Sequence, residues 1–374
     1  MMSDQVVRAA AAVLGEPLGN PVDLGGSDRS AVVRCARLDG GGSVVVKAYP
    51  QTAAGRRGFA AEAAGLAFCA LDDVGPGAFA PRVLGVDREV PLVVMSYLPG
   101  PDSPGAPSLA DLLLGPSASA AASTWLDWAV ACGRLAAVSV GRQEDFTRLR
   151  AGYGAHEDWG GRVRGIVLSA ADLVAPLGMA APAGLEADLA DAVTVLDSGY
   201  QVFSPGDICP DNNLITADGV RFVDFESAGF HSVFLDAAYL RMPFSSCWCV
   251  LRMPAWLTAA GEKAYRAEVA AVFGDLKSDA VWEAGLLRAM AAWTLHAMSY
   301  LLDRAVRSEE SMNEPVAAAP GRRQLLRYRW QMLADALSAA DEMPALRELM
   351  SGLLAATEHW QAPGLPLYPA LRRT

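Results

Sequence analysis

The stretch "GDICPDNNLITADGVRFVDFES", residues 206–227, combines a polar loop with two short apolar runs and ends among acidic residues. Residues 214–215 and 221–225 are typical of short strands, and the tripeptide "ADG" between them is typical of a tight turn. A loop followed by a hairpin brings Asp207, Asn212 and Asp224 towards a single point. We therefore expect these three side chains to form one site.

The residue types indicate the chemistry of this site. Oxygen ligands from Asp and Asn suit Mg2+, which keeps several waters and shares its remaining positions with phosphates. Two of the side chains would hold the metal, and Asp207 would then orient a hydroxyl and accept its proton during attack on a phosphoryl group. The pattern Asp-x-x-x-x-Asn alone is weak evidence, because turns are rich in both residues and a solvated loop also explains it.

A lysine in the first hundred residues strengthens this interpretation. The chain has only three lysines, and one of them, Lys47, lies inside the apolar run "VVVKAY". A lysine ammonium is a compact charge that commonly binds nucleotide phosphates. Glu62, in the middle of the next helical stretch, is its natural ion-pair partner. The alternative is a strand lysine whose charged end reaches solvent, beside a surface glutamate.

A glycine-rich segment precedes this lysine. The sequence "LGGSDRSAV" places Gly25, Gly26 and Ser27 in the turn between two predicted strands. Backbone amides that no side chain covers can approach phosphate oxygens there. An ordinary β-turn explains the segment equally well.

The order of predicted elements indicates two lobes. Residues 31–39, 44–49, 80–87 and 90–98 have the pattern of strands, residues 56–71 that of a helix, and helical patterns dominate from residue 109 onward. The Pro-, Gly- and Ser-rich segment 99–108 lies between the two regions. We expect an N-terminal nucleotide-binding lobe at residues 1–98 and a helical C-terminal lobe at residues 99–374 that carries the catalytic loop, the metal site and the acceptor pocket.

Charge and composition limit the classes of partner. The net charge is -11 and the isoelectric point is near 4.9, whereas nucleic-acid binders usually carry a basic surface that neutralises phosphates. No apolar stretch reaches the length of a membrane span, and the first residues lack the basic start and apolar centre of a secretory signal. We expect a cytoplasmic protein that binds neither nucleic acid nor membrane.

The ordered set of these features resembles the aminoglycoside phosphotransferase and choline kinase family, whose fold is similar to that of protein kinases. The resemblance rests on the glycine turn, "VVVKAY", "AAEAAGLAF", "LVVMSYLPG", "GDICPDNN" and "VDFESAGF", and it covers roughly residues 20–245. It implies an α+β fold with a small antiparallel β-sheet lobe containing one helix and a larger, mainly helical lobe. It also implies a small-molecule kinase that uses Mg2+ and ATP or GTP.

The family motifs assign roles to individual residues of this sequence. Asp207 matches the catalytic aspartate, Asn212 and Asp224 match the magnesium ligands, and Lys47 and Glu62 match the phosphate-binding pair. The hinge motif implies that Met95 fills the back of the adenine pocket and that the backbone of Ser96 and of Leu98 bonds the base. With Gly25, Gly26 and Ser27 these residues complete the expected nucleotide site, whereas Glu226 receives no role.

The resemblance leaves the acceptor and the degree of activity open. We expect transfer to a hydroxyl of an aminoglycoside-like, amino alcohol or sugar-containing metabolite, and the acidic balance of the chain accommodates a cationic substrate most easily. The family usually has histidine two residues before the catalytic aspartate, where this chain has Pro205, which cannot make the hydrogen bonds of a histidine. The alternative is therefore a nucleotide-binding pseudokinase or scaffold with little or no transfer activity.

Overall fold

The computed structural model describes residues 2–27, 29–75, 77–99, 105–154, 158–242, 247–313, 316 and 319–372. The chain divides into two compact units. Unit 1 contains residues 1–109, 138–157 and 202–230, and unit 2 contains residues 110–137, 158–201 and 231–374. Residues 100–104 of the expected inter-lobe segment lie outside the described residues, and the division between residues 98 and 99 stays a prediction.

Unit 1 is built on an antiparallel sheet with the strand order β1-β2-β3-β5-β4. Its strands are β1 (Leu18–Ser27), β2 (Ser30–Arg37), β3 (Ser43–Ala48), β4 (Val83–Asp87) and β5 (Leu92–Ser96). The strands predicted from the valine-rich runs are confirmed, because β-branched residues pack well on a pleated surface. β3 is bonded to β2 on one side and to β5 on the other, so Lys47 lies on an inner strand.

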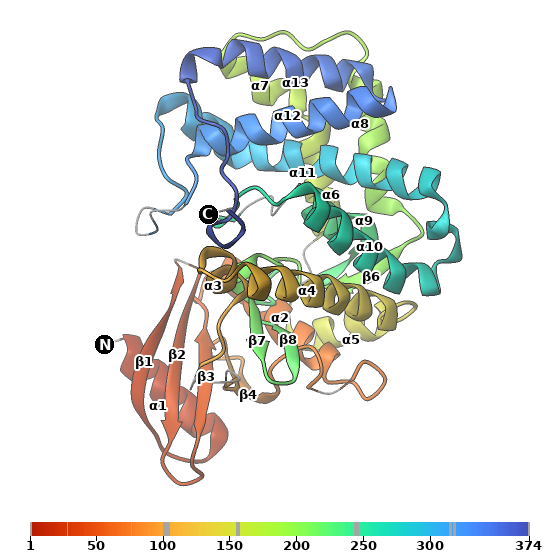
Figure 1. Ribbon diagram of the computed structural model, residues 1–374. Coiled ribbons are helices and arrows are strands. Elements are labelled where there is room, and N and C mark those ends of the chain that lie inside the picture. Colours follow the sequence, from red (N-terminus) through yellow and green to blue (C-terminus); the bar gives the residue numbers. More distant parts are fainter. Residues whose placement is uncertain are drawn as a thin grey trace. The chain divides into compact units, whose positions relative to one another are not determined.

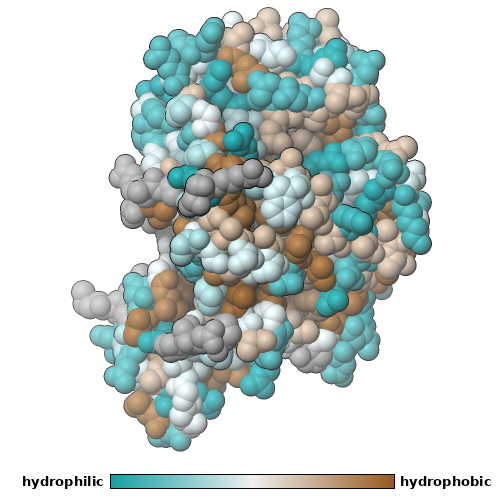
Figure 2. All heavy atoms as spheres, viewed as in Figure 1, coloured by the Kyte–Doolittle hydropathy of each residue, from teal (hydrophilic) through white to brown (hydrophobic). Residues whose placement is uncertain are grey.

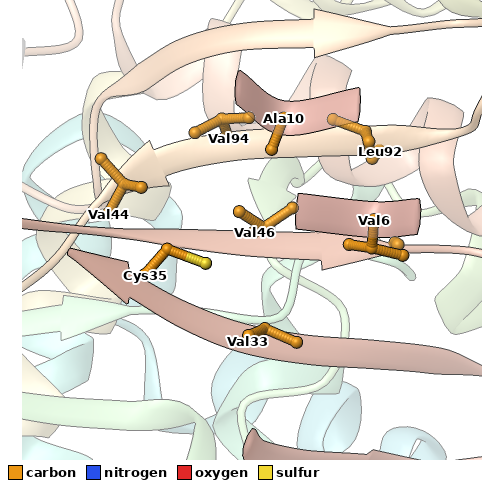
Figure 3. Close-up of a cluster of buried hydrophobic side chains, with 9 residues drawn as sticks. Val6, Ala10, Val33, Cys35, Val44, Val46, Leu92 and Val94 are labelled. Carbon is orange, nitrogen blue, oxygen red and sulfur yellow. The ribbon is translucent and has the colours of Figure 1, made fainter. Parts of the chain in front are cut away.

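Helix α1 (Met2–Leu14) covers one face of this sheet. Figure 3 shows Val6 and Ala10 of α1 facing Val33 and Cys35 of β2, Val44 and Val46 of β3, and Leu92 and Val94 of β5. All of these side chains are buried, and each buried aliphatic side chain stabilises the fold by about 1.5–3 kcal/mol relative to an exposed one. The sheet that carries Lys47 therefore has a packed core of its own.

Helix α2 (Ala53–Cys69) is the helix predicted between β3 and β4, and Thr52 caps it by accepting a hydrogen bond from the amide of Gly55 at 3.1 Å. Small residues dominate α2, so neighbouring elements approach it closely and bury most of its residues from Phe59 onward. Helix α5 (Gln143–Tyr153) packs against α2, where the rings of Phe68 and Phe146 meet edge to face with centroids 6.0 Å apart.

The remainder of unit 1 contains the polar loop and the two short apolar runs of residues 206–227. Strand β6 (Gln201–Ser204) pairs with β9 (Gly229–Ser232), and β7 (Asn213–Thr216) pairs with β8 (Gly219–Phe222) as the predicted hairpin. The ring of Phe225 stacks on Phe203 at 6.3 Å, and Phe203 in turn lies 4.4 Å from Phe68 of α2. This aromatic contact joins the segment after β8 to α2.

Unit 2 is helical, and Figure 1 shows α11, α12 and α13 running side by side. Its core contains large side chains that are fully buried, including those of Trp125, Trp128, Trp282 and Trp330. The predicted dominance of helices after residue 109 is confirmed. The first residue of α3 and the last residue of α4 belong to unit 1. Apart from these two residues, the α-helices of unit 2 are α3 (Leu109–Leu114), α4 (Ala118–Val138), α6 (Trp159–Leu168), α7 (Ala170–Val174), α8 (Leu185–Ala192), α9 (Val233–Arg241), α10 (Ala255–Val272), α11 (Asp279–Arg307), α12 (Arg322–Ala340) and α13 (Pro344–Ala356).

These elements confirm the predicted α+β class, with an antiparallel sheet in the N-terminal part and a larger helical part after it. Helix α1 adds a second helix to the N-terminal sheet. Hydrophilic and hydrophobic residues are interspersed on the face drawn in Figure 2. None of the helices in the described ranges is both long enough and apolar enough to cross a membrane.

Candidate functional site

Lys47 is the centre of a buried cluster of charges in unit 1. Its side chain is 5% exposed, and its Nζ donates to Glu62 Oε2 at 2.8 Å and to Asp224 Oδ1 at 2.5 Å. The structure therefore brings together three of the residues predicted from the sequence. It excludes the alternative in which the lysine end reaches solvent and the glutamate lies on the surface.

The position of Glu62 depends on a close approach between α2 and the segment after β8. A Cβ on Gly65 would lie 2.8 Å from Phe225 Cδ1 and 2.9 Å from Ala228 Cβ, which leaves no room for a larger residue. Gly65 is three residues from Glu62, so it lies on the same side of α2. The Tyr49 hydroxyl, from the end of β3, donates a second hydrogen bond to Glu62 Oε2 at 3.0 Å and holds that carboxylate in place.

Asp224 follows β8 by two residues, close to its predicted position at the strand end. Its backbone is left-handed, with φ of 66°, a conformation that aspartate and asparagine adopt more readily than most residues. Phe225 directly after it is fully buried in the aromatic contact described above. The turn therefore anchors one side chain in the core and directs the preceding carboxylate at Lys47.

Glu226 is a site residue to which the sequence analysis gave no role. Its side chain is 8% exposed, its Oε2 lies 3.8 Å from Lys47 Nζ, and its Oε1 forms an ion pair with Arg29 Nη1 at 2.7 Å. Arg29 lies in the turn between β1 and β2, three residues after Gly26. One sequence feature could have identified Glu226: it lies two residues after Asp224. Alternate residues of such a segment can both reach the ammonium of Lys47.

Burial and the mixture of charges shift the pKa values of this cluster. Burial favours the neutral amine of Lys47, but Glu62, Asp224 and Glu226 outweigh that effect, so the pKa of Lys47 is raised and the ammonium stays charged. Burial raises the pKa of Glu62 although Lys47 and Tyr49 oppose the change. Burial and the neighbouring Asp224 likewise raise the pKa of Glu226. The cluster holds more carboxylates than cations and attracts further positive charge.

Asp207 lies in a loop between β6 and β7 that local hydrogen bonds hold in shape. Its Oδ1 accepts from the amide of Cys209 at 3.3 Å, and its carbonyl oxygen accepts from Asn212 Nδ2 at 3.1 Å. The amide of Gly206 donates to Ser204 Oγ at 3.0 Å, so a side-chain hydrogen bond closes the turn around Pro205. Hydrogen bonds within the protein therefore hold this loop, whereas a solvated turn would bond mainly to water.

The environment of Asp207 raises its pKa from 3.8 to about 7. Burial is the largest cause, followed by the negative charges of Asp224 and Asp211, while the Cys209 amide and Arg29 act in the opposite direction. A carboxylate with a pKa near neutrality is suited to accept a proton at physiological pH. This raised pKa is compatible with the predicted role of Asp207 as the base, and that role stays a prediction.

Asn212 lies beside the Asp224 segment, because its carbonyl oxygen accepts a hydrogen bond from the amide of Val223 at 2.9 Å. Its side-chain nitrogen is committed to Asp207, which leaves the side-chain oxygen available for a cation. With the Asp224 carboxylate this makes an all-oxygen donor set within a region of excess negative charge, which fits Mg2+ better than a thiophilic metal. The residues present therefore fit the implied ion.

The glycine segment and the predicted hinge also lie in unit 1. Gly25 and Gly26 are not in the hairpin turn but in the last residues of β1, with φ of 99° and 138°, and Ser27 ends that strand. A Cβ on Gly26 would lie 2.3 Å from the carbonyl oxygen of Ser30, so strand pairing alone explains this glycine. A role of the three residues in binding phosphate stays a prediction.

Met95, Ser96 and Leu98 lie in and just after β5. Met95 is buried, and the Ser96 amide donates to the carbonyl of Arg82 at 2.9 Å, so this amide is already bonded within the protein, and a bond from the Ser96 backbone to a base stays a prediction. In the part of the chain that the structure describes, the Leu98 amide has no hydrogen-bond partner. That free amide is compatible with a donor to a bound base.

The glycine before Asp207 provides a test of the loop geometry. Gly206 has φ of 87°, and a Cβ there would lie 2.1 Å from the carbonyl oxygen of Ser227. We expect Gly206→Ala to lower the free energy of unfolding by more than about 2 kcal/mol, because backbone strain of 1–2 kcal/mol adds to a steric clash. Gly219→Ala is the matched control, since Gly219 has φ of 105° and no atom closer than 3.8 Å to its Cβ position. Equal losses in urea unfolding of the two variants would contradict the close approach.

Comparison with known proteins gives one family. The sequence profile of the phosphotransferase enzyme family matches residues 26–272, which is more than half of the chain. A search of curated protein sequences gives no match.

Solved structures share the fold at low identity. A choline/ethanolamine kinase family protein from Mesorhizobium loti is 17% identical, with a TM-score of 0.51 over 95% of this chain and 100% of that one. The amicoumacin kinase hAmiN in complex with AMP-PNP, Ca2+ and Ami is 13% identical, with a TM-score of 0.51 over 90% of this chain and 94% of that one. At these identities the likeness shows a common fold.

Proposed function

The chain belongs to the phosphotransferase enzyme family, and from this premise we propose that it is a small-molecule kinase. It transfers the γ-phosphate of ATP or GTP to a hydroxyl of an aminoglycoside-like, amino alcohol or sugar-containing metabolite. The single observation that carries the proposal is the buried contact of Lys47 with both Glu62 and Asp224, beside an aspartate whose pKa is about 7. A lysine held in this way is a fixed positive charge for phosphate oxygens.

In the proposed reaction Asp207 orients the acceptor hydroxyl and accepts its proton as the oxygen attacks the γ-phosphorus. The bond between the γ-phosphorus and the β,γ-bridging oxygen breaks, and ADP or GDP leaves. The hydrogen bond from the Cys209 amide to Oδ1 fixes one carboxylate oxygen and leaves Oδ2 to face the acceptor. Lys47 binds phosphate oxygens of the nucleotide, and Glu62 keeps its ammonium in position. Phosphoryl transfer needs little covalent participation from the protein, so positioning and electrostatic stabilisation supply most of the rate.

Asn212 and Asp224 would hold Mg2+, and Glu226 lies close enough to the same charges to assist. When bound, the ion would neutralise the negative charge that the phosphates bring to a region already rich in carboxylates. The amicoumacin kinase, whose structure contains AMP-PNP and Ca2+, supports the use of a nucleotide together with a divalent cation in this fold.

Pro205 favours a second candidate, a nucleotide-binding pseudokinase or scaffold. A proline offers neither the side-chain hydrogen bonds of a histidine nor a backbone N–H. The hydrogen bond from Gly206 to Ser204 Oγ and the tight packing of Gly206 on Ser227 hold the same turn without a histidine. These contacts support an active enzyme, in which Asp207, Asn212, Asp224 and Lys47 act in the proposed roles.

Metal-dependent nucleotide binding tests the proposal. We expect calorimetric titration to show that ATP or GTP binds at least about tenfold more tightly with Mg2+ than with EDTA, a difference of about 1.4 kcal/mol, because the carboxylates repel the free phosphates. Asp224→Asn should remove most of this Mg2+ effect. Asp218→Asn, in the exposed turn of the β7–β8 hairpin, is the matched control and should retain it. If neither nucleotide binds in the presence of Mg2+, the proposed function is wrong.

A further inference from the structure

A cavity of about 770 Å3 lies among the helices of unit 2, and all of its lining residues within the described ranges belong to that unit. The end of α9, the first half of α10 and parts of α11 and α12 form its walls, together with segments around residues 252 and 367. Its size is within the range of small-molecule sites in proteins. None of the residues assigned to the candidate catalytic site contributes to it.

The inner wall of the cavity is apolar and adaptable. Three methionines from three different segments line it, Met253 and Met290 being buried and Met332 half-buried. Methionine side chains fill irregular spaces and adjust to ligands of different shape. Tyr328 adds an aromatic face, and its hydroxyl makes no hydrogen bond among the described residues. Such a wall suits the apolar body of a ligand and offers one polar contact.

Two of the cations that line the cavity are already neutralised. Arg241 forms ion pairs with Glu262 at 2.7 Å and with Glu283 at 2.5 Å. Arg266 forms an ion pair with Asp279 at 2.7 Å and lies over the ring of Trp282. These residues build the wall of the cavity and hold its helices together.

The other two cations, Arg252 and Lys263, have no ion-pair partner in the ranges that the structure describes. Both are exposed, Arg252 just before α10 and Lys263 on that helix. A chain with a net charge of -11 thus places two uncompensated positive charges at one apolar cavity. A pair of charges in this setting attracts anions.

The same lining disfavours a cationic ligand. Glu262 is the acidic residue among the described lining residues, and both of its oxygens accept hydrogen bonds from Arg241. Oε1 accepts a further hydrogen bond from Trp282 Nε1 at 2.7 Å. The carboxylate is therefore committed to the protein and is not available to an amine.

We propose that this cavity is a binding site for an organic anion with an apolar body, whose charged group contacts Arg252 and Lys263 and whose body lies against Met253, Met290 and Met332. None of the residues assigned to the candidate site in unit 1 lines this cavity, and the proposed ligand has the opposite charge to the cationic acceptors considered for the kinase. The proposal depends on none of the residues that carry the proposed function.

Ligands with the same body and different charge test the proposal. We expect octanoate to bind at least about tenfold more tightly than octylamine in calorimetric titrations, with octanol between them, because only the carboxylate gains from the two cations. The double variant Arg252→Gln/Lys263→Gln should weaken octanoate binding about tenfold and leave octanol binding unchanged. Both substituted side chains are exposed, so the variant should fold as the wild type does.

Two further variants complete the test. Lys277→Gln removes one positive charge from an exposed lysine outside the cavity and should leave octanoate binding unchanged. Ala336→Phe should weaken both octanoate and octanol, because residue 336 lines the cavity and a larger side chain would fill it. Octylamine binding as tightly as octanoate, or equal effects of Lys277→Gln and the double variant, would overturn the proposal. Asp207→Asn should bind octanoate as the wild type does. Octanoate binding therefore tests the cavity independently of phosphate transfer.

Discussion

Asp207→Asn should lower phosphate transfer by about 10²–10⁴-fold, the usual contribution of a positioned general base. The substitution keeps the size of the side chain and the acceptor for the Cys209 amide, but an amide cannot take a proton from the hydroxyl. Nucleotide binding should remain, because Lys47, Glu62 and Asp224 are unchanged. The measurement is the initial rate of transfer at saturating ATP and Mg2+, with affinity for ATP determined in parallel.

Asp218→Asn provides the control for this experiment, because it makes the same chemical change in an exposed hairpin turn. It should leave the rate unchanged. If Asp207→Asn retains more than about a tenth of the wild-type rate, proton acceptance by Asp207 contributes less than about 1.4 kcal/mol to catalysis and the assigned role is wrong.

The pH dependence of stability gives a second result for the same variant. The pKa of Asp207 is about 7 in the folded protein, above its ordinary value of 3.8, so its contribution to stability is present at low pH and is lost as pH rises through about 7. The metal-free wild type should therefore lose stability relative to Asp207→Asn between pH 4 and pH 8. One pKa unit corresponds to about 1.4 kcal/mol, so we expect urea unfolding to show a relative change of at least that size. Parallel curves for the two proteins would contradict the buried environment of Asp207.

Lys47→Met should abolish transfer and destabilise the protein by about 3–5 kcal/mol, since removing one partner of a buried ion pair leaves uncompensated charge. Methionine fills nearly the same volume, so the loss arises from charge. Lys47 Nζ contacts Glu62 and Asp224 directly and lies 3.8 Å from Glu226, and no other cation is within ion-pair distance of Glu62 among the described residues. Equilibrium unfolding in urea measures the loss.

A double variant separates the two effects of Lys47. Lys47→Met/Glu62→Gln should recover part of the lost stability, because the fully buried carboxylate is replaced by a neutral amide, but it should not recover transfer. The deficit of Lys47→Met should also shrink as pH falls, because Lys47 no longer lowers the raised pKa values of Glu62 and Glu226, which then take up protons more readily. A deficit that is small and constant from pH 5 to pH 8 would contradict the buried cluster.

The sequence predicted the parts of the site that depend on local pattern. A valine run with one lysine predicts an inner strand, and the turn "ADG" between two short apolar runs predicts a hairpin; both are present. The pairing of Lys47 with Glu62 followed from their order along a strand and the next helix. The order of motifs predicted the family, and the match over residues 26–272 confirms it.

Features that depend on contacts between distant segments could not be predicted from local sequence patterns. Glu226 is a site residue because its carboxylate lies close to Lys47 and Arg29, which are 179 and 197 residues earlier in the chain. Nothing in the sequence distinguishes Gly65 and Gly206 from the other glycines. Only the structure shows that the ring of Phe225 packs against Gly65 and that the backbone of Ser227 packs against Gly206. The cavity in unit 2 combines residues from α9 to the C-terminal segment, so no local pattern marks it.

Phosphate transfer by this protein can be measured as the transfer of radiolabel from γ-labelled ATP or GTP to a panel of aminoglycosides, amino alcohols, sugars and nucleosides. The proposed kinase predicts a labelled product with at least one acceptor in the presence of Mg2+, and formation of that product at least about a hundredfold more slowly by Asp207→Asn. Tight binding of nucleotide without a labelled product from any acceptor class would contradict an active enzyme and favour the pseudokinase that Pro205 suggests.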